Sequence, residues 1–198
     1  MSLPSIVQIG APVLRGAAHD VAPERILTQE FQDLVKTMID VMRQAPGVGL
    51  AAPQIGIPLR LIVLEDREEF LTRLSPDELR DRERVPFSTR VFVNPVLTLV
   101  GDETAVFFEG CLSVSGYMAL VERRLEVEVS GLDEHANRQT WRVRGWPARI
   151  LQHEIDHIGG TLYIDRMKTR SFTTVEQAKE HYGDKSVTEI VRSLKLES

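Results

Sequence analysis

The stretch ILQHEIDHIGG, residues 150–160, carries two histidines and a glutamate in the pattern HExxH. The residues around it, 146–158, have the character of a helix with an apolar face. On a helix, side chains four positions apart lie one above the other, so His153 and His157 can reach a single ion. Glu154 lies next to them, close enough to act on a water molecule bound to that ion. The spacing therefore indicates a hydrolytic metal site with two neutral nitrogen ligands and an adjacent base.

The alternative is a helix that carries two structural histidines by chance, in a chain with five histidines. Trp146 and Ile150 precede His153 and His157 along the same stripe, so the two rings continue an inward-facing apolar surface. Buried imidazoles need polar partners, and a shared ion supplies one. A catalytic site usually has a third protein ligand. The candidates from the residues alone are Cys111 upstream and, downstream, Asp165, Glu176, Glu180 and His181.

The only cysteine of the chain, Cys111, stands in the segment EGCLSV, residues 109–114. One cysteine cannot form an internal disulfide, and a buried free cysteine is most often a small apolar filler. A thiolate is nevertheless a strong ligand for zinc or ferrous iron. Gly110 lets the backbone pass close to such a site, and Leu112 can point its N–H inward. Cys111 is therefore a candidate third ligand.

Composition limits the classes of partner. The chain has 198 residues and a formal net charge of −5, so no overall basic field attracts nucleic acid or anionic lipid. No run of about 18 apolar residues is present, so no membrane span is expected. The N-terminal MSLPSIVQIG has neither the basic region nor the long apolar region of a secretory signal. One domain over residues 1–198 and a bacterial cytoplasmic location are expected, or an organellar location if a leader has been removed.

Hydrophobic patterns predict an α+β fold, with several short antiparallel strands around a central helix that carries HExxH. An N-terminal helix is predicted over residues 28–43, with Thr28 as its N-cap, and a peripheral C-terminal helix within residues 185–198. The glycine-rich residues 47–58 are predicted as a loop, and the charged residues 66–90 as a surface insertion at the rim of a cleft. The predicted strands are 59–65, 91–100, 104–108, 118–121, 125–131 and 140–144.

Three segments resemble the signature motifs of peptide deformylases. They are GVGLAAPQ at residues 47–54, EGCLS at 109–113 and QHEIDH at 152–157, followed by a glycine at Gly160. Their order and approximate separations also agree, and the resemblance extends from about Gln8 to about Val175. The segments GWPARILQHEIDH and YIDRMKTRSFTTV are most similar to the subgroup found in plants, in mitochondria and in some bacteria.

The resemblance implies an enzyme that removes the formyl group from the N-terminal formylmethionine of nascent polypeptides and releases formate. It implies one divalent metal ion per chain, Fe²⁺ in vivo with Zn²⁺, Ni²⁺ or Co²⁺ as replacements. The implied ligands are Cys111, His153 and His157. Glu154 is the implied general base and acid. The Gln54 amide and the Leu112 N–H are the implied donors to the oxyanion.

The family also implies where the substrate lies. The segment around Val48 and Gly49 pairs with the extended peptide as an added strand does. Trp146 and Ile150, two turns and one turn before His153, fall where the family lines its methionine pocket. For Trp146 the alternative is ordinary core packing.

Four other charged residues are candidates for structural or surface roles. Asp156 is expected in a structural salt bridge, and Glu109 either pairs with Arg123 or is solvated. In some bacterial members the C-terminal helix touches the ribosome. Here this segment has few basic residues, Arg192 and Lys195. We therefore prefer a solvated face, and a transient ribosome contact is the alternative. Two other functions remain: a zinc metallopeptidase with a downstream third ligand, and a metal-bearing module without activity.

Overall fold

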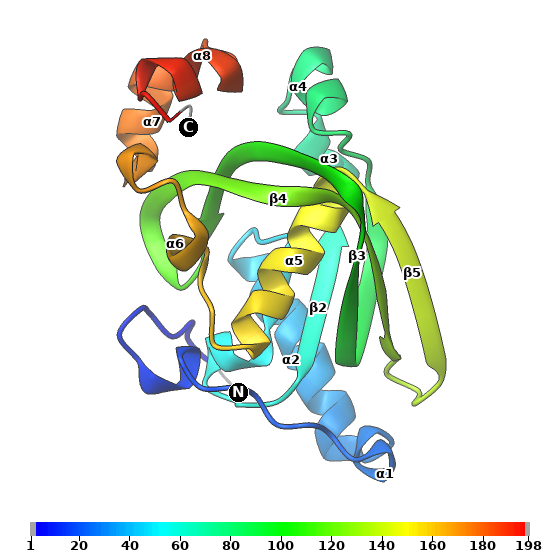
Figure 1. Cartoon of the computed structure of the whole chain (residues 1–198). Helices are drawn as coiled ribbons and strands as arrows, with labels where there is room; N and C mark the ends of the chain where they lie inside the picture. The colour runs from blue at the N-terminus through cyan, green and yellow to red at the C-terminus, as the bar shows by residue number, and fades with distance from the viewer. Residues whose placement is uncertain (1–2, 197–198) are drawn as a thin grey trace.

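A computed structural model describes residues 3–196, and its main feature is one antiparallel sheet (Figure 1). Strands β1 to β5 neighbour one another in chain order, and the short β6 pairs with β4 outside this path. The sequence predicted a mixture of helices and antiparallel strands, and this prediction is confirmed. The strands are β1 (Gly49–Ala51), β2 (Leu61–Asp66), β3 (Phe87–Cys111), β4 (Val114–Leu132), β5 (Arg138–Arg144) and β6 (Thr173–Thr174).

The predicted N-terminal helix is α2, and it is confirmed within one residue at each end. Thr28 caps it by accepting a hydrogen bond from the Phe31 N–H, which would otherwise lack a partner. Its apolar stripe is buried against the sheet, where it contacts β1 and β2. The helices are α1 (Pro23–Ile26), α2 (Gln29–Gln44), α3 (Glu68–Leu71), α4 (Pro76–Asp81), α5 (Trp146–Ile158), α6 (Tyr163–Arg166), α7 (Val175–Tyr182) and α8 (Val187–Ser193).

The prediction of only short strands is wrong for the middle of the sheet. The predicted strands 91–100 and 104–108 are parts of β3, and 118–121 and 125–131 are parts of β4. The ladder between β3 and β4 continues with a register shift between Val100 and Thr104, where Gly101 has φ +63°. A glycine adopts that conformation without strain, so a sequence that reads as a turn is accommodated as an irregularity inside one strand.

The prediction of a loop over residues 47–58 is wrong in part. Gly49 to Ala51 form β1, which pairs with β2 in the register Gly49 to Leu64. A single 3₁₀ turn over Ala52–Ile55 follows, and Gly56 ends it with φ +82°. A strand of three residues is too short to give a periodic sequence pattern, so only its pairing with β2 defines it.

The predicted surface insertion, residues 66–90, is folded and partly buried. It contains the short helices α3 and α4, and Ser75 caps α4 by accepting from the Glu78 N–H. Both predicted ends are wrong, because Asp66 ends β2 and residues 87–90 begin β3. The segment is also not fully exposed to solvent, because one of its ion pairs is buried. The guanidinium of Arg84 meets the Asp66 carboxylate at 2.7 and 2.8 Å, and the side chains are 10% and 0% exposed.

Helix α5 has the predicted bounds and lies against the sheet, where it contacts β1, β2, β4 and β5 (Figure 1). Gly145, with φ +74°, turns the chain from β5 into α5, and Pro147 occupies the first turn, where it loses no hydrogen bond. A Cβ at Gly145 would lie 2.4 Å from Cβ of Glu83 in the insertion. The insertion is therefore packed against the start of the helix that carries HExxH.

The C-terminal segment holds two helices where the sequence predicted one. The predicted helix within 185–198 is α8, which buries Ile190, and its last two positions, 197–198, lie outside the described residues. Helix α7 was not predicted, because its stripe of buried residues reduces to Ala178 alone. Among the described helices, none combines the length and the apolar character needed to cross a lipid bilayer.

Candidate active site

A cavity of about 440 Å³ opens between α5, β1 and the end of β3. Nine of the ten predicted site residues line it, and His157 is buried behind them with 1% exposure. The nine are Val48, Gly49, Gln54, Cys111, Leu112, Trp146, Ile150, His153 and Glu154. Lining residues that the sequence did not predict include Arg84, Phe108, Tyr117, Arg149 and Val175. The fold thus gathers three distant sequence motifs around one space.

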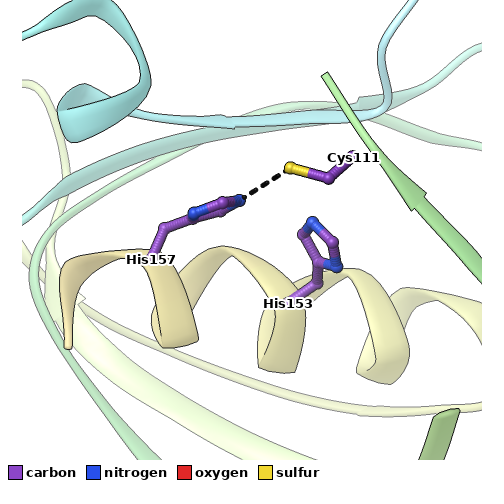
Figure 2. Close-up of side chains that lie close together, drawn as sticks. All are labelled: Cys111, His153 and His157. Carbon is purple, nitrogen blue, oxygen red and sulfur yellow. Dashed lines mark hydrogen bonds between the residues drawn. The ribbon is translucent and has the colours of Figure 1, made fainter. Parts of the chain in front are cut away.

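Cys111 and the two histidines of α5 meet at the inner end of this cavity (Figure 2). The Cys111 Sγ lies 3.3 Å from Nε2 of His157. One ligand atom from each of Cys111, His153 and His157 lies within 4.8 Å of the others. Within residues 3–196 this is the only group of three such side chains with that geometry. The register of β3 and the helical spacing of α5 together create it.

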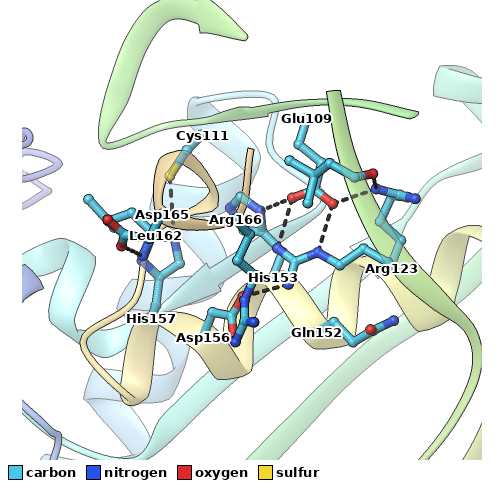
Figure 3. A network of polar contacts seen from close by, with 12 residues as sticks. Glu109, Cys111, Arg123, Gln152, His153, Asp156, His157, Leu162, Asp165 and Arg166 are labelled. Atoms are coloured by element: carbon cyan, nitrogen blue, oxygen red, sulfur yellow. Dashed lines mark hydrogen bonds and ion pairs between the residues drawn. The ribbon is translucent and has the colours of Figure 1, made fainter. Parts of the chain in front are cut away.

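Glu109 fixes the orientation of the His153 ring (Figure 3). Its Oε2 lies 3.0 Å from Nδ1 of His153, so Nδ1–H donates to the carboxylate and Nε2 is left for the ion. Burial lowers the pKa of His153, but the Cys111 sulfur and Glu109 outweigh it and hold that pKa well above its ordinary value. The surroundings of this ring favour positive charge, as a site for a cation does.

Glu109 is itself held by two buried arginines. Arg123 meets its two oxygens at 3.0 and 2.9 Å, and Arg149 meets one of them at 2.6 Å. Arg123 also donates to Asp156 at 2.5 Å, and Arg166 pairs with Asp156 from the other side. The salt bridge predicted for Asp156 is confirmed. For Glu109 the pairing with Arg123 is confirmed and the solvated alternative is wrong, because both side chains are about 5% exposed.

We expect Arg123→Met to destabilise the fold by about 3–5 kcal/mol, because it leaves two buried carboxylates without their shared partner. Urea unfolding followed by circular dichroism measures the change. Arg80→Met is the matched control. Arg80 pairs with Asp77 but its side chain is 70% exposed, so the loss should stay below about 1 kcal/mol. A similar small loss for Arg123→Met would contradict the importance of the network.

His157 fits the same cation site. Burial first, and then the charge on His153, lower the pKa of His157 well below its ordinary value, so the ring is neutral and can act as a nitrogen ligand. Its Nδ1 is buried without a hydrogen-bond partner in the described residues. A thiolate with two imidazoles is a donor set that suits zinc or ferrous iron. These residues therefore fit a single divalent transition-metal ion.

Glu154 lies beside the ligands and has few polar contacts of its own. It is 4% exposed, and its Oε2 has no hydrogen-bond partner in the described residues. Burial raises the pKa of its carboxyl to about 7. A Cβ at Gly49 would lie 2.4 Å from Oε1 of Glu154, so only glycine at this position of β1 leaves room for the carboxylate. The second glycine of GVGL thus has a steric role that the sequence did not reveal.

Gln54 is oriented by the backbone next to it. Its Oε1 accepts a hydrogen bond of 2.8 Å from the Ala51 N–H, which leaves the amide NH₂ to face the cavity. Nε2 lies 3.6 Å from the Cys111 Sγ and 3.4 Å from the Ser113 Oγ. Leu112 follows Cys111 in the same turn, and its carbonyl accepts from Gln8 at 3.0 Å. The Gln54 amide thus lies beside the sulfur, which also accepts from the Ser113 N–H at 3.4 Å, and Leu112 lines the same cavity.

Trp146 forms a side wall of the cavity together with the insertion. The guanidinium groups of Arg82 and Arg84 lie 5.1 and 5.4 Å from its ring centroid, within cation–π distance. Ile150 follows one turn later on α5 and is 4% exposed. The charged insertion therefore borders the cavity beside Trp146, because Arg84 also lines it.

Sequence reasoning missed Arg149. This buried arginine links Glu109 to the carbonyls of Val121 and Ala105. It stands four residues before His153 on α5, on the inward face. An arginine on the buried side of a helix that carries HExxH needs a buried anion, and that requirement was the available signal.

A family model described as polypeptide deformylase matches residues 3–172. Peptide deformylase 1A, chloroplastic, from Solanum lycopersicum is 52% identical over 175 residues, which cover 88% of this chain and 63% of that protein. The mitochondrial peptide deformylase of Homo sapiens is 42% identical over 170 residues, covering 86% and 70%. This chain thus spans less than two thirds of the tomato protein's length.

A solved structure gives the same result for the fold. The class I type b peptide deformylase from Acinetobacter baumannii, bound to Met-Ala-Ser, superposes with a TM-score of 0.74 at 30% identity. The match covers 84% of this chain and 99% of that one.

Proposed function

Because the chain belongs to the peptide deformylase family, we propose that it removes the formyl group from the N-terminal formylmethionine of nascent polypeptides and releases formate. The family predicted from three motifs is confirmed by the match over residues 3–172. The observation that carries the proposed activity is the convergence of a thiol and two imidazoles beside a buried carboxylate and an oriented amide. We treat residues 1–198 as one catalytic unit built around the helix that carries HExxH.

We propose that Cys111, His153 and His157 hold one divalent ion, Fe²⁺ in vivo, with Zn²⁺, Ni²⁺ or Co²⁺ as replacements. Such an ion supplies a Lewis acid that lowers the pKa of water and polarises the formyl oxygen. Glu109 fixes the ring of His153 by accepting the Nδ1 proton, so Nε2 is the nitrogen that would bind the ion. Full activity with zinc alone in air would count against iron, because a ferrous ion beside a thiolate is sensitive to oxygen.

Glu154 moves the protons of the reaction. It accepts one proton from the attacking water as the C–O bond to the formyl carbon forms. It then delivers that proton to the nitrogen as the C–N bond breaks, which yields formate and a free methionine amine. Its pKa near 7 suits both directions of transfer. No other carboxylate in the described cavity is free for this, because Glu109 is held by Arg123 and Arg149.

Gln54 and Leu112 stabilise the negative charge that develops on the formyl oxygen. The Gln54 amide is already oriented by the Ala51 N–H, so little reorganisation is needed when the charge appears. A donor placed in this way typically lowers the activation free energy by about 2.7–4 kcal/mol. The Leu112 N–H is the second donor, from the turn that carries Cys111.

The peptide is proposed to lie along Val48 and Gly49 as an added strand, with methionine against Trp146 and Ile150. The Acinetobacter baumannii relative bound to Met-Ala-Ser supports a peptide in this cleft. Relatives named chloroplastic or mitochondrial support action on proteins made in organelles or bacteria. A transient ribosome contact through Arg192 and Lys195 would bring the enzyme to its substrate.

We expect Trp146→Ala to raise KM for formyl-Met peptides about tenfold with a smaller change in kcat, because the wall of the methionine pocket is lost but no reacting group is. Steady-state formate release and metal analysis on the same samples measure both. Metal content should equal that of the wild type. Unchanged kinetics would reject the assignment of Trp146 to the pocket.

The runner-up, a zinc metallopeptidase, needs a third ligand downstream of HExxH. The downstream candidates are all exposed, and the three clustered side chains include Cys111 instead. Incubation with formyl-Met-Ala-Ser, acetyl-Met-Ala-Ser and an internal peptide separates the two activities. The proposed function requires formate from the first peptide only, whereas cleavage of the internal peptide without formate would establish the alternative. No reaction with any peptide would favour the inactive module.

A further inference from the structure

The hairpin turn that follows Cys111 lacks the geometry that so tight a turn usually has. Cys111 pairs with Val114, so Leu112 and Ser113 alone connect β3 to β4. Two-residue hairpin loops favour turns with a positive φ at one or both positions, because the twist of such turns matches that of the strands. Neither Leu112 nor Ser113 has a positive φ. The shape of this turn therefore depends on contacts from elsewhere in the chain.

A segment near the start of the sequence supplies these contacts. It consists of Val7, Gln8 and Ile9, and we call it the N-terminal strap. The Ile9 N–H donates to the Ser113 carbonyl at 2.7 Å. The Val7 N–H donates to the Gln54 carbonyl at 2.8 Å. The backbone on each side of Gln8 is thus fixed to one of two turns that carry predicted site residues.

The side-chain amide of Gln8 adds a third connection. Its Nε2 donates to the Leu112 carbonyl at 3.0 Å, and its Oε1 accepts from the Ser115 N–H at 3.3 Å. Leu112 lies in the turn, and Ser115 lies in β4 where the ladder is irregular, next to the register shift between Gly110 and Cys111. An amide suits this position because it carries a donor and an acceptor side by side.

The Leu112 carbonyl that Gln8 holds belongs to the same peptide unit as the Ser113 N–H. In a trans peptide these two groups point in opposite directions. The Ser113 N–H donates to the Cys111 Sγ at 3.4 Å, and this sulfur faces the two histidine rings (Figure 2). A hydrogen bond to the carbonyl on one side of the unit therefore aims the N–H on the other side at the sulfur.

We propose that Gln8 is a positioning residue for Cys111. It holds the peptide between Leu112 and Ser113 in the one orientation that keeps an N–H on the sulfur, and it thereby fixes the sulfur for the ion. The inference rests on the proposed function, because Cys111 is a proposed ligand. Gln8 does not line the cavity, so its effect reaches the site only through this turn.

The first test is competition for Co²⁺ between the protein and a weak chelator. We expect Gln8→Leu to lower the affinity about tenfold, the low end for residues that support a ligand. Gln8→Glu has the same length and keeps the acceptor for Ser115 but loses the donor to Leu112, so it should lose about as much. Gln177→Leu, which removes an exposed amide that donates to Glu180, is the matched control and should bind as the wild type does.

The second test is the absorption spectrum of the same proteins saturated with Co²⁺. A thiolate bound to Co²⁺ gives a charge-transfer band, and hydrogen bonds to the sulfur tune its electronic properties. Without the N–H the sulfur gives up an electron more easily. We expect the band to move to longer wavelength in Gln8→Leu and Gln8→Glu and to stay in place in Gln177→Leu. KM for formyl-Met-Ala-Ser should not change, because Gln8 lies outside the cavity.

Affinity or a band position equal to that of the wild type in both Gln8 variants overturns the inference. A loss of affinity without a band shift does so too, because it would assign Gln8 to support of the fold instead of the sulfur. Wild-type protein that binds Co²⁺ without a sulfur band removes Cys111 from the ligands, and the inference falls with it. A shifted band in protein that releases no formate would reject the proposed activity and support the role of Gln8.

Discussion

We expect Glu154→Gln to lower kcat by about 10³–10⁴-fold without loss of the metal ion, because the proposed mechanism gives this carboxylate both proton transfers and no role as a ligand. The amide is nearly the same size and fills the same space beside Gly49, so the fold and the ligands are preserved. The measurement is formate release from formyl-Met-Ala-Ser together with the metal content of the same sample. Gln54→Leu, which removes one oxyanion donor, should cost less, about 10²–10³-fold.

Gly49→Ala tests the same carboxylate from the other side. Its added Cβ would come within 2.4 Å of the Glu154 Oε1, so the carboxylate must move away from the reacting water. We expect a loss of kcat larger than the loss in metal content. Glu176→Gln, at an exposed position of α7, is the matched control and should leave both unchanged. Glu154→Gln protein with activity within tenfold of the wild type would remove Glu154 from the reaction.

We expect Cys111→Ala to abolish activity and to lower metal affinity by more than about 100-fold, a larger loss than residues supporting a ligand usually cause. In the proposed site the sulfur is one of three ligands, and within residues 3–196 no fourth His, Cys, Asp or Glu belongs to the cluster. Metal content after dialysis against a weak chelator measures the affinity. His157→Ala should behave in the same way.

His181→Ala is the matched control for the histidine. It removes an exposed imidazole of α7 that the metallopeptidase alternative would use as a third ligand. We expect it to retain the ion and the activity. Loss of the ion in His181→Ala, with retention in Cys111→Ala, would transfer the site to the alternative ligand set.

The sequence predicted the residues of the site better than the shape of the sheet. Helix α5 could be predicted because its period, its proline and its following glycines all agree, and it brings His153 and His157 together by spacing alone. The position of Cys111 beside them depends on the pairing of β3 with β4. This pairing brings Cys111, 42 positions before His153 in the chain, against α5. Only the resemblance to a family supplied that contact in advance.

Two features could not be predicted, because they depend on contacts between distant segments. The bend of β3 and β4 passes through Gly101 and through charged residues that read locally as turns. The buried network is similar, since Arg123 and Arg149 look like solvated charges until Glu109 lies between them. Strand β6 is likewise defined only by its pairing with β4, because its two residues carry no periodic pattern.

The central claim is that one ion, held by a sulfur and two ring nitrogens, makes this chain a deformylase. Protein purified under nitrogen, analysed for metal and assayed for formate from formyl-Met-Ala-Ser in the same preparation, tests it most directly. The account predicts about one divalent ion per chain, formate in proportion to that ion, and loss of both in Cys111→Ala. Formate release that is unaffected by removal of the ion, or a stoichiometric ion with no formate, would contradict it.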